Sequence, residues 1–216
     1  MKKYLFSIAF TTAGFFAVAQ NTAKDVFTKD QIVWYGLDFS KAKMIGAFDQ
    51  GAGAAPASGS EIKTKYVPAW NSLILNESAK YDIKKTFRKT EVYNDLSMVE
   101  KNNSKIDVDE FLTSNDYKFD NPNSVVEGIV NSYDKGDKTE GIGLVFIVES
   151  FNKKATKASI YVTFFDIATK KVLFTEHMTG EPGGFGLRNY WARTIKEILD
   201  QIDRGTYKSW KKTYSK

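Results

Sequence analysis

A glycine-rich segment between the last expected strand and the last expected helix holds the residues best placed to bind a ligand. Glycines permit positive φ angles and a close backbone approach, and the first amides of a helix are unpaired donors that favour an anion. The segment therefore predicts a site for a small anionic ligand or a partner's carboxylate. Its residues are Gly183, Gly184, Gly186, Arg188 and Asn189. The spacing matches neither a P-loop nor a Gly-x-Gly-x-x-Gly motif, so a purely structural turn stays open as the alternative.

Nucleophilic and metal chemistry has few residue types to draw on in this chain. His177 is the only histidine, and there is no cysteine. A Ser–His–Asp unit would lack the Gly-x-Ser-x-Gly elbow, and one histidine leaves too few good ligands for zinc. We therefore predict no catalytic residues, no bound metal and no cofactor. His177 is expected in an ordinary structural place, roughly opposite Ile160 in a hairpin.

Carboxylates are the remaining candidates for catalysis. Glu149 and Glu176 lie at the ends of expected strands, and Asp107, Asp109 and Glu110 lie close together. A glycosidase needs two carboxyls about 5 to 10 Å apart across a cleft. An EF-hand loop needs a glycine and a twelfth-position glutamate, which the cluster at Asp107 lacks. We therefore favour the interpretation that these residues are surface carboxylates without a catalytic role. The alternative function is a hydrolase that acts on an envelope or extracellular polymer through Glu149 and Glu176.

The elements that must position these residues follow from the hydrophobic pattern. Strands are predicted at residues 32–39, 91–99, 142–148, 159–165 and 171–178, and a loop at residues 49–60. Helices are predicted at residues 67–88, 108–112, 122–133 and from 187 onward, with Gly205 ending or interrupting the last one. This order predicts an α/β sandwich with a mixed sheet, helices on both faces, and a C-terminal three-stranded antiparallel meander followed by a helix.

Both faces of the expected hairpin at residues 159–178 are too apolar for water. Strict alternation places one set on one face: Tyr161, Thr163, Phe165, Val172 and Phe174. It places the other set on the opposite face: Ile160, Val162, Phe164 and Leu173. The strand at residues 142–148 is also apolar throughout, apart from glycine, and needs cover on both faces. Helices or a second subunit must provide it.

The first residues have the pattern of a secretory signal peptide. Three residues with two lysines precede an apolar run, which ends in Ala17-Val18-Ala19, small residues of the kind that signal peptidase recognises. The run falls short of the about 20 residues that a membrane helix needs. We predict cleavage between Ala19 and Gln20. The remaining residues 20–216 should form one globular domain, which is either periplasmic or secreted. Without cysteine it has neither a disulfide nor a lipid anchor.

The charge balance gives no indication of a nucleic-acid partner. The formal net charge is +5, of which Lys2 and Lys3 leave with the signal peptide. That excess is mild, whereas nucleic-acid binding needs basic residues gathered on one face. Near the C-terminus, Tyr207, Trp210 and Tyr214 share a helical face among lysines. This pattern is typical of a membrane-surface or partner-binding helix, or of a terminal helix folded back on its own domain.

Three segments carry a resemblance to known proteins: YVTFFD at residues 161–166, KVL at 171–173 and GGFGLRNYW at 183–191. They resemble a family of exported proteins from Bacteroidetes, mainly over residues 140–200. The element order and the strand–Asp–turn–strand–glycine loop–helix ending are similar to the amino-terminal domain of TolB and to the envelope proteins LpoB and CsgG. The resemblance implies a non-enzymatic accessory or partner-binding role in the cell envelope. Together with the glycine-rich segment, it makes another envelope protein or a small anionic ligand the expected partner. Homo-oligomerisation is left open.

Overall fold

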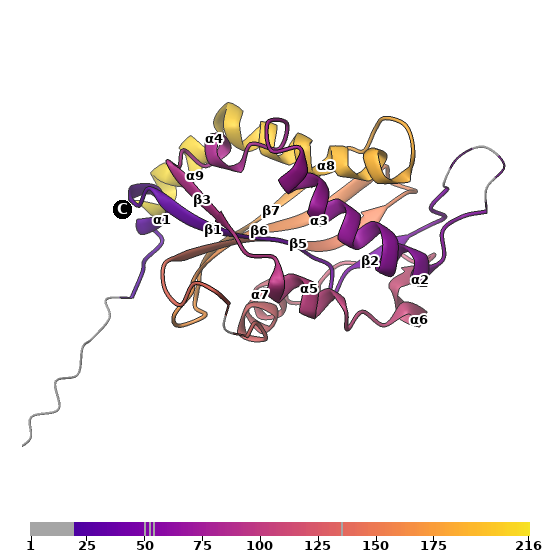
Figure 1. Ribbon diagram of the computed structural model, residues 1–216, viewed down its shortest axis with the longest axis horizontal. Helices are drawn as coiled ribbons and strands as arrows, with labels where there is room; N and C mark the ends of the chain where they lie inside the picture. Colours follow the sequence, from indigo (N-terminus) through magenta and orange to yellow (C-terminus); the bar gives the residue numbers. More distant parts are fainter. Residues whose placement is uncertain (1–19, 50, 52, 54, 135) are drawn as a thin grey trace, which may run out of the picture.

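The computed structural model describes residues 20–49, 51, 53, 55–134 and 136–216 (Figure 1). The predicted signal peptide at residues 1–19 lies outside this range. The strands are β1 (Gln31–Asp38), β2 (Lys43–Ile45), β3 (Glu91–Asn94), β4 (Leu112–Thr113), β5 (Ile142–Asn152), β6 (Lys157–Asp166) and β7 (Val172–Gly180). The helices are α1 (Asp25–Thr28), α2 (Gly59–Glu61), α3 (Val67–Asn76), α4 (Ile83–Thr86), α5 (Ser97–Asn103), α6 (Val108–Phe111), α7 (Pro122–Asn131), α8 (Leu187–Gln201) and α9 (Tyr207–Tyr214). Two π-helical turns, Ile62–Tyr66 and Ile202–Thr206, precede α3 and α9.

β5 lies at the centre of the sheet. β1 and β2 both pair in parallel with the same edge of β5. β1 pairs with residues 143–147 and β2 with residues 150–152. β3 lies beyond β1, and β4 lies beyond β2, both in parallel. On its other edge β5 pairs antiparallel with β6, which pairs antiparallel with β7. The α/β class predicted from the sequence is confirmed.

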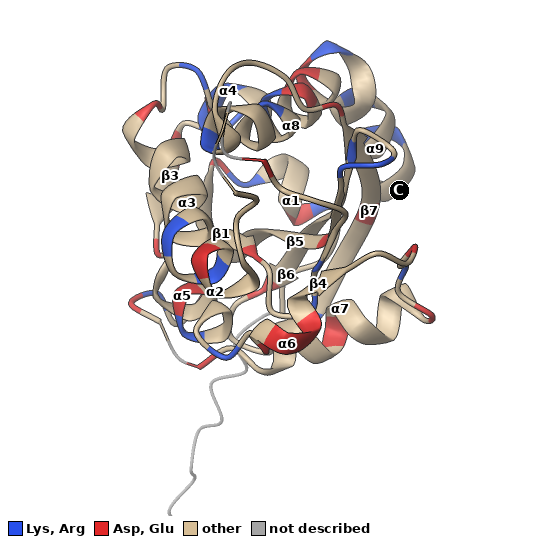
Figure 2. Cartoon of the chain, turned by 90° about the vertical axis from the view of Figure 1, so that its right-hand side faces the viewer, with Lys and Arg blue, Asp and Glu red and all other residues tan. Residues whose placement is uncertain are grey.

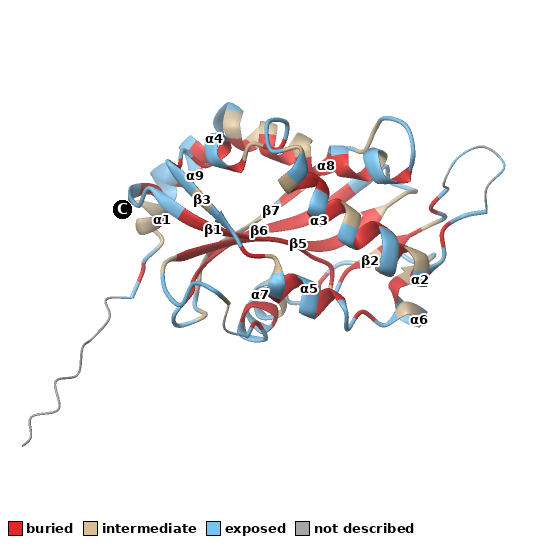
Figure 3. Cartoon of the chain, in the orientation of Figure 1, coloured by how far each residue is buried: buried red, intermediate tan, exposed pale blue. Residues whose placement is uncertain are grey.

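Helices lie on both faces of the sheet, with α3, α4, α8 and α9 above it and α5 and α7 below it in Figure 1. The upper core contains Trp34, Phe146, Phe164 and Trp191. The lower core contains Tyr35, Val126, Val145 and Phe165. β5 is buried at every position up to Phe151, as Figure 3 shows, because its side chains point alternately into the two cores. The cover predicted for both faces of this strand is therefore provided by helices of the same chain.

The register of the β6–β7 hairpin departs from strict alternation. Phe164 lies opposite Phe174, whereas Phe165 lies opposite Val172, so Leu173 is the extra residue of a β-bulge. Because side chains alternate with a period of two, one extra residue moves the following side chains to the other face. Phe174 therefore packs in the same core as Phe164, and its predicted place on the face of Phe165 is wrong.

The helix predicted at residues 67–88 has different bounds in the structure. The helix begins at α2, where the Ser58 side chain caps its first turn. Pro68 is the second residue of α3, just beyond the π-helical turn, so its missing N–H falls near the point where the hydrogen-bond pattern changes. α3 then ends, and Asp82 caps the separate short helix α4 by accepting a hydrogen bond from the Lys85 N–H.

Two other segments give a shorter strand and a matching helix. The strand predicted at residues 91–99 ends at Asn94, and α5 begins three residues later. The short helix predicted at residues 108–112 is confirmed as α6.

The C-terminal segment folds back onto its own chain. Gly205 has φ 176° and ψ −28° inside the second π-helical turn and interrupts the helix between α8 and α9, as predicted. Tyr207 and Trp210 are buried in the upper core. Tyr214 stacks on Phe174 with ring centroids 4.3 Å apart. The predicted alternative of a terminal helix packed on its own domain is confirmed.

Basic and acidic residues both occur over the end of the molecule that Figure 2 presents. Among the described residues, no helix is both long enough and apolar enough to cross a membrane.

Candidate functional site

The predicted glycine site lies at the carboxyl end of β7, in the glycine loop formed by residues 181–186. Gly184 has φ +97° and Gly186, the N-cap of α8, has φ +75°. These left-handed conformations favour glycine, as the sequence predicted. Gly180 is required for another reason: a Cβ atom there would lie 2.2 Å from the backbone oxygen of Thr194 in α8.

The five predicted residues divide among different surroundings. Gly184 and Gly186 line a small hollow of about 150 Å³, together with Lys153 and Tyr190, where the Lys153 Nζ lies 4.6 Å from the Tyr190 ring centroid. Gly183 and Asn189 line a neighbouring hollow of about 520 Å³, which Gly184 also touches.

Arg188 lines neither hollow. Its Nε donates to Asn189 Oδ1 at 3.1 Å, and its backbone oxygen accepts a hydrogen bond from Trp70 Nε1 at 2.9 Å. The glycines therefore shape a loop. The cations beside its hollows are not Arg188 but Lys153 at the smaller hollow, and Lys80, Arg193 and Lys196 at the larger one.

Phe185, at the tip of the glycine loop, is the residue that the sequence analysis missed. It is 94% exposed, and Tyr93 at 37% is the other exposed large hydrophobic residue of the described chain. The signal was present in the sequence, since a large apolar residue between two glycines has no regular element to bury it. The ring is therefore available for contact with another molecule.

The carboxylates proposed for a hydrolase do not meet. Glu176 lies opposite Val162 on the upper face and accepts a hydrogen bond from Tyr214 Oη at 2.7 Å. Glu149 lies on the lower face, where its Oε1 accepts a hydrogen bond from the backbone N–H of Phe119 at 2.9 Å. The sheet separates the two groups, so they cannot act together across a glycosidic bond.

His177 lies opposite Tyr161, one position from the predicted Ile160, as a consequence of the bulge in β7. Ser159 Oγ lies 2.5 Å from His177 Nε2 and donates to Glu149 Oε2 at 2.7 Å. A hydroxyl has a single proton, so the imidazole must donate to Ser159. A nucleophilic serine needs a base that accepts its proton, and here that proton goes to the carboxylate. The cluster is therefore arranged as a structural network.

Glu149 is held as a carboxylate inside this network. Burial acts to raise its pKa, but the contacts with His177, the Phe119 N–H and Ser159 outweigh burial, and the pKa is lowered. The folded-state pKa thus lies below the value of the unfolded chain. The resulting stabilisation is present above the unfolded pKa and is lost as the pH falls through the folded pKa.

Glu149→Gln is expected to lower the free energy of unfolding at pH 7 by about 1–3 kcal/mol. The amide N–H groups of glutamine would face the Phe119 N–H or the Ser159 hydroxyl, which are themselves donors, in a buried site. The difference in free energy of unfolding between the variant and the parent protein should shrink as the pH falls below 4.5, the ordinary pKa of a glutamate. Urea denaturation at a series of pH values measures both. Glu140→Gln is the control, since Glu140 is exposed and makes no hydrogen bond or ion pair with a described residue. A constant difference between the Glu149 variant and the parent across the acid range would contradict this assignment.

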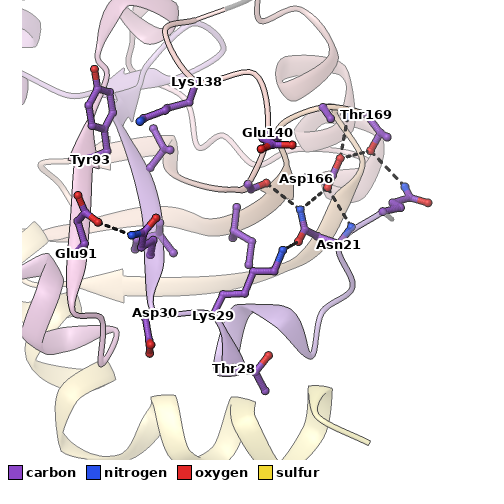
Figure 4. A pocket seen from close by; sticks show the side chains of 17 residues that line it. Asn21, Thr28, Lys29, Asp30, Glu91, Tyr93, Lys138, Glu140, Asp166 and Thr169 are labelled. Carbon is purple, nitrogen blue, oxygen red and sulfur yellow. Dashed lines mark hydrogen bonds between the residues drawn. The ribbon is translucent and has the colours of Figure 1, made fainter. Parts of the chain in front are cut away.

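Another hollow, of about 660 Å³, lies at the opposite end of the sheet (Figure 4). It is bounded by the amino ends of β1 and β5, by β3 and by the β6–β7 turn. Asp166 forms one wall, where it accepts hydrogen bonds from the Asn21 N–H at 3.1 Å and the Thr169 N–H at 2.8 Å. These bonds outweigh burial and lower its pKa. The bond from the Thr169 N–H closes the turn between β6 and β7.

Within the described part of the chain, no three histidine, cysteine or acidic side chains come together in a way that could hold a metal ion. No family model, curated protein or solved structure matches this chain.

Proposed function

We propose that this chain is an exported, non-enzymatic binding protein of the bacterial cell envelope, which docks a partner protein through the glycine loop. The signal-peptide pattern supports export, and the TolB-like ending, β7 followed by the glycine loop and α8, supports an accessory role. The observation that carries docking is the exposed ring of Phe185 between Gly184 and Gly186.

The position of the loop supports the same proposal. β2, β5 and β7 run in the same direction, so the loops that follow them lie at the same end of the sheet. Ligands of α/β proteins bind at the carboxyl ends of such strands. Burial of one phenylalanine side chain in a partner contributes about 1.5–3 kcal/mol. Lys153 beside the hollow adds a positive charge for a partner's carboxylate.

A photoreactive phenylalanine analogue at position 185, introduced into the protein in its native cells, is expected to crosslink to one defined envelope protein. The same analogue at Lys208, which is exposed on α9, is the matched control. Intact-mass measurement of the purified protein should give a chain that begins at Gln20.

Identical adducts from both positions, or none from position 185, would refute docking through the loop. A chain that still contains Met1 would refute export separately. Phe185→Ser should weaken capture of the crosslinked partner about tenfold, which corresponds to 1.4 kcal/mol. It should leave the melting temperature unchanged, because the ring makes no buried contact.

A further inference from the structure

The positive charge of the chain is concentrated in residues 204–216, which comprise α9 and its flanks. The chain has 31 basic and 26 acidic residues, and Lys2 and Lys3 lie outside residues 20–216. Residues 20–203 thus have 24 basic and 26 acidic residues, a slight acidic excess. The remaining segment has five basic residues and no acidic one: Arg204, Lys208, Lys211, Lys212 and Lys216.

α9 buries one face and exposes the other. Tyr207 and Trp210 pack in the upper core. Lys208, Lys211 and Lys212 lie on the exposed face, and none of the three makes a hydrogen bond or an ion pair with a described residue. The domain therefore holds the helix by its aromatic face and leaves the charge of its lysines available to another molecule.

The helix dipole accounts for only part of this arrangement. Cations are favoured in the last turn of a helix, where Lys211 and Lys212 lie. Lys208 lies in the first turn of α9 and gains nothing from the dipole. It also lies three and four residues from the other two lysines, a spacing at which like charges on a helix repel one another. An anion bound to this face would relieve that repulsion.

The chemistry of the face favours a broad anionic surface over a single small anion. A depression along it is shallow, and its lining includes three lysines and no acidic residue. A lysine ammonium is a compact, strongly hydrated charge, without the fixed fork with which arginine binds one phosphate or carboxylate. Lysine clusters on amphipathic helices are typical of attraction to anionic lipid headgroups. Export, which is itself proposed above, places the chain beside membranes rather than nucleic acid.

We propose that the exposed face of α9 binds the surface of an anionic phospholipid bilayer through the headgroup phosphates. The lysines lie against the headgroups, and the aromatic side chains stay in the core, so the helix does not insert. Figure 1 shows α9 and α1 at the end of the molecule away from β2. The glycine loop lies at the β2 end, since Gly184 shares a hollow with Phe48, which follows β2. Phe185 therefore remains accessible to a partner while α9 lies on the bilayer.

Sedimentation with vesicles tests the proposal on the purified mature protein, residues 20–216. The probe is a vesicle of equal parts phosphatidylglycerol and phosphatidylcholine, and vesicles of phosphatidylcholine alone are the control. The protein should bind the anionic vesicles in about 0.1 M salt and be released in about 1 M salt, because the Debye length falls from about 10 Å to about 3 Å. Each lysine near such a surface strengthens binding about fivefold, or about 1 kcal/mol.

The combined variant Lys208→Gln, Lys211→Gln and Lys212→Gln should therefore bind the anionic vesicles about 100-fold more weakly. Its matched control makes the same change in net charge at three exposed lysines outside the segment: Lys41→Gln, Lys118→Gln and Lys157→Gln. This control should lose less than about threefold, because charges beyond a Debye length from the bilayer are screened. Phe185→Ser should bind the vesicles like the parent, so this proposal and docking through the glycine loop fail separately.

Absence of binding to the anionic vesicles, equal binding to phosphatidylcholine vesicles, no loss in the α9 variant, or an equal loss in the two combined variants would overturn the proposal. Displacement by glycerophosphate would assign the face to a soluble phosphate, and tighter binding to a DNA duplex than to the vesicles would assign it to nucleic acid. Either result would also overturn it.

Tryptophan emission provides a further check on how α9 binds. All four tryptophans are buried, so their emission should stay unchanged when the vesicles are added. A shift in emission would show that α9 leaves the domain and inserts its aromatic face into the bilayer, which contradicts binding through the lysines alone.

Discussion

Deletion of residues 206–216 is expected to lower the melting temperature by about 10 °C or more. The segment buries Tyr207 and Trp210, and burial of an aromatic side chain of this size contributes about 1.5–3 kcal/mol. For a chain of this length, each kcal/mol shifts the melting temperature by about 2–4 °C. The deletion also uncovers Phe174, on which the Tyr214 ring stacks, and Phe27, whose ring centroid lies 5.4 Å from that of Tyr207.

Differential scanning calorimetry of the truncated and parent proteins measures the change. Lys208→Ser and Lys212→Ser are the controls, because both lysines are exposed on α9 and such substitutions usually stay within about 0.5 kcal/mol. An unchanged melting temperature after truncation would mean that α9 adds nothing to the fold. The aromatic and basic face would then be left for a partner or a membrane surface.

The predictable part of this fold was the part determined by local pattern. Residues 142–148 are apolar at every position except glycine, and only a strand with cover on both faces accommodates that pattern in water. Gly205 marked the break in the last helix, because glycine lowers helix stability on its own. The left-handed conformations of Gly184 and Gly186 followed from residue type in the same way.

Register and helix bounds could not be derived in this way. The bulge at Leu173 depends on how Phe174 reaches the core beside Trp210 and Tyr214, which lie far along the chain. It placed Phe174 on the unexpected face and moved His177 opposite Tyr161. Likewise, Pro68 indicates a helix start by itself, and only the π-helical turn before it lets the helix begin earlier.

The candidate sites show the same difference between local pattern, which was predictable, and contacts between distant segments, which were not. The glycine loop was visible because its residues are consecutive, but the direction of Arg188 was not, since its guanidinium is held by Asn189. The 660 Å³ hollow is lined by segments more than 40 residues apart, such as those of Asn21 and Asp166. No spacing rule on one sequence brings such residues together.

Trp191→Ala is expected to lower the free energy of unfolding by about 3–5 kcal/mol, the usual cost of removing a large aromatic side chain from a core. Trp191 is fully buried and stacks on Phe151 with centroids 4.7 Å apart, and the Phe48 ring centroid lies 5.2 Å away. It also forms the floor of the hollow beside Gly184, so the cavity left behind would loosen the glycine loop.

Trp191→Phe should cost much less, about 1 kcal/mol, although it also shrinks the ring. The indole Nε1 is buried without a hydrogen-bond partner among the described residues. Its removal relieves an unsatisfied donor worth about 1–3 kcal/mol, which offsets most of the loss from the smaller ring. Phenylalanine also keeps the stack on Phe151. Urea denaturation of both variants separates the two effects, since a phenylalanine variant as unstable as the alanine variant would show that the indole N–H has a partner in the folded protein, such as a buried water.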